Sequence, residues 1–294
     1  MVWTCVASMP RVPQGGRFVS AAGEIALKSR AGAPGALLCQ HRLPADHEFG
    51  QKTIAVRLAD SDGQRSLASI LVNRMYAWRG YGANHKLSSN RNRVTFTACA
   101  DDAVIGTLSL GVDGPDGLAA DETFKDELDR FRAIPGASLC ELTKFACDPS
   151  TKSQPALAAL FHVIFIYGTQ RYDCTDLFIE VHPRHVRFYD AMLGFQKVGA
   201  PRLNPAVTWW PADVPVQLMW LKVSEIRRLI DAHAGGKSAG GRSLYPHFFS
   251  HQEEQGIWAR IAALSSKRQD KGAPKRPDGG FSRTAGFRLQ TAAA

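Results

Sequence analysis

The sequence lacks the features that mark membrane, disulfide-rich and zinc-binding proteins. No uninterrupted apolar run approaches the ~20 residues needed to span a bilayer. Residues 1–10 contain neither a charged stretch nor a long apolar stretch, so we expect no signal peptide. The six cysteines form no Cys-x-x-Cys pair and show no zinc-ligand spacing. We therefore expect a cytoplasmic protein with reduced cysteines, no transmembrane segment and no bound metal.

In composition the chain resembles an ordinary globular protein, with 45% hydrophobic and 21% charged residues among 294. Its formal net charge is +9, but seven basic and two acidic residues lie between Lys267 and Arg288, so the rest is only mildly basic. A basic surface suits an acidic partner. It also suits nucleic acid, but the sequence has no zinc finger, recognition helix or aromatic RNA-binding signature, so we expect no nucleic-acid partner.

Composition and periodicity divide the chain into four segments. Residues 1–48 are rich in Gly, Pro and Ala without a sustained period, which predicts an irregular or disordered lead-in. Residues 49–225 alternate strand and helix patterns, which predicts one α/β domain. Residues 226–264 predict a helical extension. Residues 265–294 have too few apolar residues to offset their ordering entropy, which predicts a disordered basic tail.

The α/β domain has a regular order of predicted elements. Strands are predicted over residues 52–58, 93–100, 103–112, 139–147, 177–181 and 214–223, with another near Phe195. Helices are predicted over residues 67–78, 124–131, 155–171 and 184–192. The helix over 155–171 is apolar almost all round, so we expect it to be buried against the sheet.

The strand over residues 139–147 carries a carboxylate among apolar residues. Because side chains alternate along a strand, Glu141 is predicted to share a face with Thr143, Phe145 and Cys147. Burial there removes hydration and raises the pKa of a carboxylate toward that of a useful general base. The alternative is a structural glutamate in a salt bridge to a nearby lysine or arginine.

Two segments resemble a known family. Residues 179–189 (IEVHPRHVRFY), followed by LGF at 193–195, have the pattern of a strand, a proline-marked turn, a short helix and a glycine stop. This pattern resembles the last βαβ unit of the GNAT acyltransferase fold. Residues 140–148 (CELTKFACD) and 244–254 extend the resemblance to the N-acyl amino acid synthases, GNAT relatives that use acyl carrier protein. The first two segments also resemble the autoinducer (acyl-homoserine-lactone) synthases.

The resemblance covers roughly residues 50–262 and implies a fold and a reaction. The implied fold is α/β, the mixed GNAT sheet flanked by helices. The implied reaction moves a long-chain fatty acyl group from an acyl carrier protein thioester to the α-amine of an amino acid. No cofactor is expected to be bound, because the carrier protein brings the 4'-phosphopantetheine arm.

The resemblance also implies site residues. Glu141 matches the family's carboxylate by position and is implied as the base near the amine. Phe145, Ala146 and Cys147 are implied at the thioester, where backbone N–H groups of a bulged strand stabilise the carbonyl oxygen. Direct transfer needs no covalent intermediate, so we do not expect Cys147 to be a nucleophile.

The loop over residues 149–155, Pro-Ser-Thr-Lys-Ser-Gln-Pro, departs from the pattern of CoA-dependent GNAT enzymes because it has no glycine. Those enzymes usually have a glycine-containing loop here whose amides bind a pyrophosphate. The departure favours a carrier-protein arm, which brings one phosphate. Lys152 is a candidate to bind that phosphate, and the alternative is a solvated loop lysine.

Arg184 and Arg187 are exposed candidates for docking the carrier protein. His182 and His185 are explained by turn and helix-start roles. Tyr189 lies one residue further from the glycine stop than the usual proton-donating tyrosine, so we expect it to pack in the core.

The first helix ends in an Arg-then-aromatic pattern like that near the substrate in autoinducer synthases. Arg74 is a candidate to hold an acceptor carboxylate bidentately, and Trp78 a candidate to cover the acyl or amino-acid pocket. The alternatives are a surface arginine and a core tryptophan.

Two rival functions remain. An acyl-CoA-dependent GNAT N-acyltransferase is disfavoured by the missing glycine loop. A non-catalytic GNAT-like domain that binds carrier protein or lipid is disfavoured by Glu141.

Overall fold

The computed structural model describes residues 35–42, 53–78, 84–87, 92–100, 103–148, 154–204, 215–236 and 241–272, with side chains in the last range described to residue 264. Its strands are β1 (Leu37–Arg42), β2 (Thr53–Leu58), β3 (Arg93–Ala100), β4 (Ala103–Val112), β5 (Leu139–Cys147), β6 (Asp176–Val181), β7 (Gln196–Arg202) and β8 (Val216–Lys222). Its helices are α1 (Asp62–Trp78), α2 (Asp121–Arg132), α3 (Gln154–Tyr172), α4 (Val186–Leu193), α5 (Val223–His233) and α6 (His251–Gly272), with the single-turn helices η1 (Pro183–His185) and η2 (Tyr245–His247).

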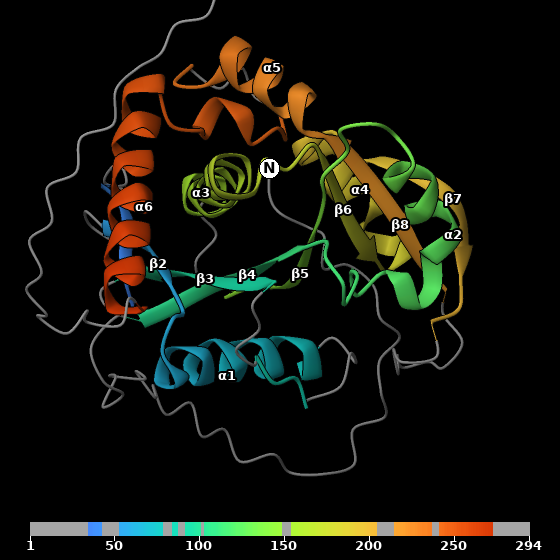
Figure 1. The fold of residues 1–294 in the computed structure, drawn as a ribbon, viewed down its shortest axis with the longest axis horizontal. Coiled ribbons are helices and arrows are strands. Elements are labelled where there is room, and N and C mark those ends of the chain that lie inside the picture. The colour runs from blue at the N-terminus through green and yellow to red at the C-terminus, as the bar shows by residue number, and fades with distance from the viewer. Residues whose placement is uncertain are drawn as a thin grey trace, which may run out of the picture.

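The strands form one mixed sheet in the order β1-β2-β3-β4-β5-β6-β8-β7 (Figure 1). Strands β1 to β5 pair antiparallel with one another in that order, and so do β6, β8 and β7. Only the β5–β6 pair is parallel among the described strands. A parallel pair needs a long crossover connection, and α3 provides it. The predicted α/β class with a mixed sheet flanked by helices is confirmed.

Helices cover both faces of the sheet. Helix α3 lies on one face together with α5, η2 and α6, and α1 lies on the opposite face (Figure 1). Helix α2 packs on that opposite face over β6 and β8, through Phe124 and Leu128. Because α3 is enclosed between the sheet and the C-terminal helices, nearly its whole surface is buried, as its sequence predicts.

Local signals in the sequence set several helix ends. The hydroxyl of Ser61 accepts a hydrogen bond from the Gln64 N–H at the start of α1. His182 Nδ1 accepts from the Arg184 N–H and starts η1, which confirms its predicted helix-start role. Gly194 ends α4 with a φ of 84°, in the left-handed region that glycine tolerates, and its N–H donates to the Asp190 carbonyl.

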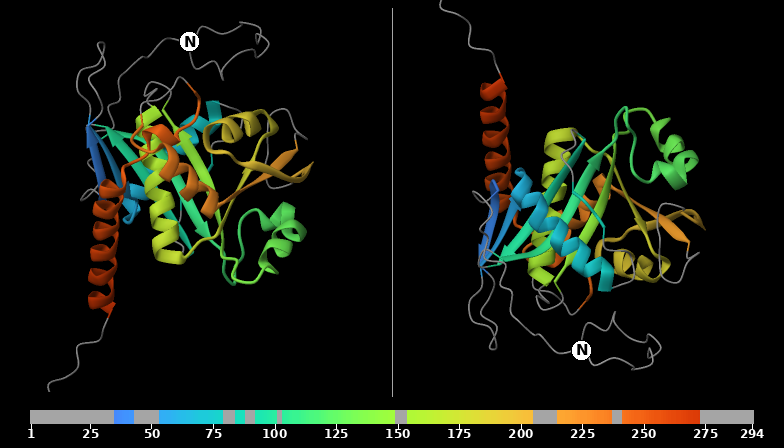
Figure 2. Two further views of the ribbon diagram at one scale, coloured as in Figure 1. Left: turned by 90° about the horizontal axis from the view of Figure 1, so that it is seen from above. Right: turned by 90° about the horizontal axis from the view of Figure 1, so that it is seen from below.

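Two predicted segment boundaries are wrong. Residues 1–48 were expected to be irregular, but 37–42 form β1, which pairs with β2. Residues 265–294 were expected to be disordered, but α6 continues to Gly272. Helix α6 also contacts β1, since Arg260 donates to the Leu38 carbonyl, and Figure 2 shows these elements side by side at the edge of the sheet.

A buried polar cluster ties the C-terminal helices to α3. The Nδ1 atom of His162 accepts the Phe249 N–H at 2.9 Å, so Nε2 carries the proton and donates to Glu254 of α6 at 2.5 Å. Arg227 of α5 donates to both carboxylate oxygens of Glu254, at 2.9 and 2.7 Å. The rings of Phe248 and Phe249 stack on the His162 ring. The cluster satisfies a fully buried imidazole and links α3, α5 and α6.

This cluster makes stability depend on pH. Burial lowers the pKa of His162 below 6.5. Burial alone would raise the pKa of Glu254, but hydrogen bonds from His162 and Arg227 outweigh it and hold that pKa at about 2. Below pH 6.5 the unfolded chain therefore binds a proton that the folded His162 does not, and below pH 4.5 the same holds for Glu254. Both effects make the free energy of unfolding fall as the pH falls.

We expect denaturant unfolding at pH 7.5, 6.0 and 5.0 to show this decline in the intact chain. His162→Leu should be less stable at pH 7.5, because it leaves Glu254 and the Phe249 N–H without their partner. It should also show a shallower decline between pH 6.5 and 5. An equal decline in both proteins would contradict the role given to His162.

Candidate active site

The parallel strands β5 and β6 separate part of the way along their length. Their register runs from Leu139 opposite Asp176 to Leu142 opposite Ile179 and stops there. Strand β5 nevertheless continues to Cys147, paired with β4, and β6 continues to Val181, paired with β8. A V-shaped gap therefore opens beyond Leu142 and Ile179.

A β-bulge lies where the strands separate. Thr143 pairs with Ser109 and Ala146 with Thr107, so Lys144 and Phe145 together stand opposite one residue of β4. Lys144 has a φ of 55°, a conformation that non-glycine residues rarely adopt. The bulge interrupts the regular hydrogen bonding between β4 and β5 next to the gap, so that backbone groups of β5 are left out of it.

The bulge overturns the predicted alternation of side chains. Phe145 turns to the α3 face, where its ring lies 5.4 Å from that of Phe161, and Ala146 packs on the α1 face. Cys147 is paired with Gly106, where a Cβ would point to the α3 face and lie 3.7 Å from Leu160 Cδ2. The prediction that Phe145 and Cys147 share the face of Glu141 is therefore wrong, because it assumed a regular strand.

Glu141 is buried, with 2% of its surface exposed, and its carboxylate is bound by three donors. Oε1 accepts from Arg93 Nη2 at 2.9 Å and from the Ala119 N–H at 2.8 Å, and Oε2 accepts from the Ala120 N–H at 3.1 Å. Burial raises the pKa of Glu141, and these hydrogen bonds and the Arg93 charge oppose that rise. Gly111 of β4 makes room for it, since a Cβ there would lie 3.0 Å from the Glu141 Cγ and Oε1.

These contacts match the structural alternative, a salt-bridged glutamate. Glu141 anchors the loop that leads into α2, and as a base it would have to exchange one of its hydrogen bonds for a proton. Its assignment as the base stays a prediction, and the geometry favours an anchoring role.

A second carboxylate, which the sequence analysis missed, lies at the gap. Glu180 is the first residue of β6 after the last β5–β6 pair, and it faces the same side as Phe178 and Glu141. Its Oε1 accepts from Asn204 Nδ2 at 2.9 Å. Burial is the main cause that raises the pKa of Glu180, to about 7. The available signal was a lone glutamate in the apolar strand Leu-Phe-Ile-Glu-Val, at the carboxyl end of a parallel strand.

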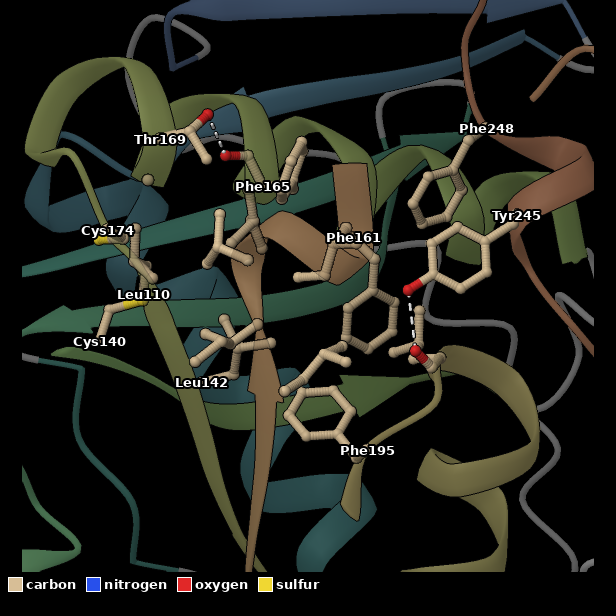
Figure 3. Close-up of a pocket in the computed structure, with 17 residues that line it drawn as sticks. Leu110, Cys140, Leu142, Phe161, Phe165, Thr169, Cys174, Phe195, Tyr245 and Phe248 are labelled. Carbon is tan, nitrogen blue, oxygen red and sulfur yellow. Dashed lines mark hydrogen bonds between the residues drawn. The ribbon is translucent and has the colours of Figure 1, made fainter. Parts of the chain in front are cut away.

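An apolar cavity of about 40 Å³ lies on the other face of the sheet, between α3 and strands β5, β6 and β8 (Figure 3). The residues that line it include Cys140, Leu142, Phe161, Leu177, Leu221 and Phe248. Its one phenol, Tyr245, donates to the Leu193 carbonyl at 2.8 Å, so the walls present little unsatisfied polarity. Gly168 and Cys174 form the end that lies farthest from the gap, near the start of β6.

The remaining predicted residues fall into different surroundings. Arg74 is exposed and its guanidinium pairs with Asp148, directly after β5. Trp78 is the last residue of α1, but its side chain lies outside the described residues, as does Lys152. Arg184 and Arg187 are exposed on η1 and α4, directly after the gap strand β6.

Tyr189 packs between aromatic rings. Its ring centroid lies 5.1 Å from that of Phe188 and 6.0 Å from that of Phe195, as the packing prediction requires. The described part of the chain holds no group of three or more potential metal ligands, and none of its helices is long and apolar enough to cross a membrane.

Comparisons with known proteins agree with this geometry. Residues 68–222 match the family model of the N-acyl amino acid synthase FeeM. The solved structure of FeeM, an N-acyl amino acid synthase from uncultured soil microbes, is 26% identical, with a TM-score of 0.51 over 60% of this chain and 93% of that chain.

More distant structures are also similar. The GNAT domain of PAT from S. lividans is 16% identical, with a TM-score of 0.38 over 62% of this chain and 96% of that chain. The acyl-homoserine-lactone synthase LasI is 14% identical, with a TM-score of 0.40 over 63% and 91%. No curated protein matches the chain.

The family match covers more than half of the chain and includes β3 to β8, the bulge and the gap. The mixed sheet flanked by helices is similar to the fold of the solved family member FeeM. This chain therefore belongs to the N-acyl amino acid synthase family and is an N-acyltransferase.

Proposed function

We propose that this N-acyltransferase moves a long-chain fatty acyl group from an acyl carrier protein thioester to the α-amine of an amino acid. The observation that carries the proposal is the β5–β6 gap, which has an apolar cavity on one face of the sheet and carboxylates on the other. This arrangement suits an apolar donor chain and a polar acceptor that meet at one point.

In this proposal the 4'-phosphopantetheine arm enters the gap and brings its thioester to the point where β5 and β6 separate. Phe145, Ala146 and Cys147 border the arm, and backbone N–H groups of the bulge stabilise the carbonyl oxygen as it gains negative charge. Lys152 would meet the phosphate of the arm. The neutral amine attacks, the C–N bond forms, the C–S bond breaks and the departing sulfur receives a proton, so no cofactor resident in the enzyme is needed.

The carrier protein as donor is supported by surface charge and by one loop. Arg184 and Arg187 are exposed beside the gap strand, where they suit the acidic surface of a carrier protein. The loop over residues 149–155 has no glycine to cradle the pyrophosphate of CoA. For the acceptor, Arg74 and Trp78 stay candidates, although Arg74 would first have to release Asp148.

We expect the acyl carrier protein thioester to give a higher initial rate than the matching acyl-CoA. This advantage should shrink as added salt reduces the Debye length below ~8 Å, because the docking charges are exposed. Arg184→Glu and Arg187→Glu should weaken use of the carrier protein much more than use of a short acyl-pantetheine. Initial rates with the three donors across a salt series provide the measurement.

The matched control is Arg130→Glu, the same charge reversal at an exposed position on α2. It should leave the preference for the carrier protein unchanged. Equal or faster rates with acyl-CoA that do not respond to salt would favour the CoA-dependent enzyme instead.

At about 40 Å³ the cavity is smaller than a long acyl chain, so in this proposal the chain widens it on entry and its far wall limits the chain length. A Cβ at Gly168 would lie 3.5 Å from Leu110 Cδ2 and 3.7 Å from Cys174 Sγ, both on the cavity wall. Gly168→Leu should therefore fill the far end of the cavity and shift the preferred donor to a shorter chain. Mass spectrometry of products from a mixture of donor chain lengths measures this shift. Gly168→Ala, whose methyl group makes ordinary contacts, should keep the parent profile, and an unchanged profile in Gly168→Leu would show that the chain binds elsewhere.

Glu141→Gln separates the anchoring role from the base role. The new amide NH₂ would face a donor, either Arg93 or one of the two backbone N–H groups, so we expect the free energy of unfolding to fall by about 1–3 kcal/mol. Turnover of the folded variant should stay within about tenfold of the parent. A loss of about 10²-fold with unchanged stability would restore Glu141 as the base.

A further inference from the structure

We propose that Glu180 is the general base that takes the proton from the acceptor's ammonium group, and that the acceptor amine reaches the thioester from the face of the sheet opposite α3. This inference rests on the proposed transfer to an amine and not on the identity of the thioester donor. It is carried by the position of Glu180, by the unequal surroundings of its two oxygens, and by the charges near it.

Glu180 lies at the point in the sheet where the acceptor amine and the thioester would meet. Ile179 is paired with Leu142, and Glu180 is the next residue, so its Cα borders the opening of the gap. Its partner on the other side is Leu218 of β8, which packs under α2. Extending the register by two residues from the Glu141–Phe178 pair places Thr143 across the gap from Glu180. The apolar cavity lies behind this point, on the α3 face.

The two carboxylate oxygens differ in their surroundings. Oε1 is held by Asn204, whereas Oε2 is buried and has no hydrogen-bond partner among the described residues. The hydroxyls of Thr143 and Thr123 are also buried without a partner in this part of the structure. Thr123 interacts with Glu180 as a weak side-chain hydrogen-bond donor and lowers its pKa, although no well-formed hydrogen bond within the described residues satisfies the Thr123 hydroxyl or Oε2. Buried polar atoms without partners are costly, and an ammonium or amine with several N–H donors would satisfy them.

Three carboxylates on this side of the sheet are more deeply buried than Glu180, and each has a cationic partner. Glu141 is paired with Arg93, Asp176 with Lys222 and Glu127 with Arg202. Glu180 has no cationic partner in the described residues, and its carboxylate interacts with the amide of Asn204 and more weakly with Thr123. Among the described residues, no opposite charge beside Glu180 favours its ionised form, so Glu180 is positioned to exchange a proton.

The charges that face Glu180 are negative. Glu141 of β5 and Glu122 of α2 both raise its pKa, in addition to burial, while Asn204 and Thr123 lower it. The balance holds the pKa of Glu180 at about 7, near the operating pH at which a general base is efficient. The same negative field attracts a cationic amine. The surroundings therefore favour an acceptor that arrives as an ammonium ion.

Each proton in this acyl transfer has a donor and an acceptor. The ionised Glu180 takes one proton from the ammonium nitrogen, which leaves a neutral amine with a free lone pair. The lone pair attacks the thioester carbonyl, and the C–N bond forms. The C–S bond then breaks, and the departing sulfur takes the second proton of the attacking nitrogen. The products are an amide, a free thiol and a protonated Glu180, which returns its proton to solvent.

Measuring kcat/KM against pH, with one donor and one amino acid acceptor throughout, tests the proposal. The parent should show an acidic limb with an apparent pKa near 7. Glu180→Gln should lower kcat/KM by about 10²-fold or more and remove that limb. Its deficit should shrink at alkaline pH, where the acceptor amine loses its proton without help. A purely structural role for Glu180 would not produce that recovery.

Substitutions at two residues near Glu180 should shift the apparent pKa of the acidic limb in opposite directions, while Glu180 itself is unchanged. Glu122→Gln, at an exposed position, removes a negative charge and should shift the limb to lower pH with an unchanged plateau rate. Asn204→Ala removes a hydrogen bond that favours the ionised form and should shift the limb to higher pH. These two variants also keep the test informative if Glu180→Gln folds poorly.

The outcomes separate this inference from the proposed function. A parent enzyme that forms N-acyl product, together with a folded Glu180→Gln variant of equal kcat/KM at every pH, would overturn the role of Glu180 alone. A limb that neither Glu122→Gln nor Asn204→Ala moves would do the same. A parent enzyme that forms no N-acyl product with carrier-protein or CoA thioesters would overturn both.

Discussion

Two parallel strands can part inside a sheet only where each keeps another partner, because buried backbone N–H and C=O groups need hydrogen bonds. In this protein β5 stays paired with β4 to Cys147, and β6 stays paired with β8 to Val181. The strands on each side of the gap are thus hydrogen-bonded within their own half of the sheet. The gap therefore leaves few backbone N–H and C=O groups without a hydrogen bond. The bulge at Lys144 and Phe145 lies at this point, where the bending of β5 exposes backbone groups.

The C-terminal extension contributes to the site although it is distant in sequence. Tyr245 and Phe248 close one side of the apolar cavity, and they are positioned by the cluster of His162, Glu254 and Arg227. Removing water from a fully buried imidazole is unfavourable unless both ring nitrogens are bonded, and here both are. The cavity is therefore a joint product of the acyltransferase sheet and the added helices.

Regular periodicity in the sequence predicted the regular parts of this fold. The hairpin of β3 and β4 and the strand β5 have the predicted bounds, because their alternation or apolar character is continuous. Strand β1 was missed because a short edge strand in a Gly- and Pro-rich region is recognisable only from its pairing with β2. The predicted side-chain faces beyond Thr143 are wrong for a different reason. The bulge depends on a positive φ at Lys144, and the conformational preference of lysine does not predict a positive φ.

The candidate site shows the same limit, since a carboxylate's role depends on partners that are distant in sequence. Glu141 and Glu180 each stand alone in an apolar strand, so their local sequences are alike. Arg93, 48 residues away, favours the ionised form of the first, whereas Asn204, 24 residues away, binds only one oxygen of the second. The negative charge of ionised Glu141 then raises the pKa of Glu180. An anchored carboxylate can thus tune its neighbour, because fixing one negative charge in a buried site makes a second one harder to form there.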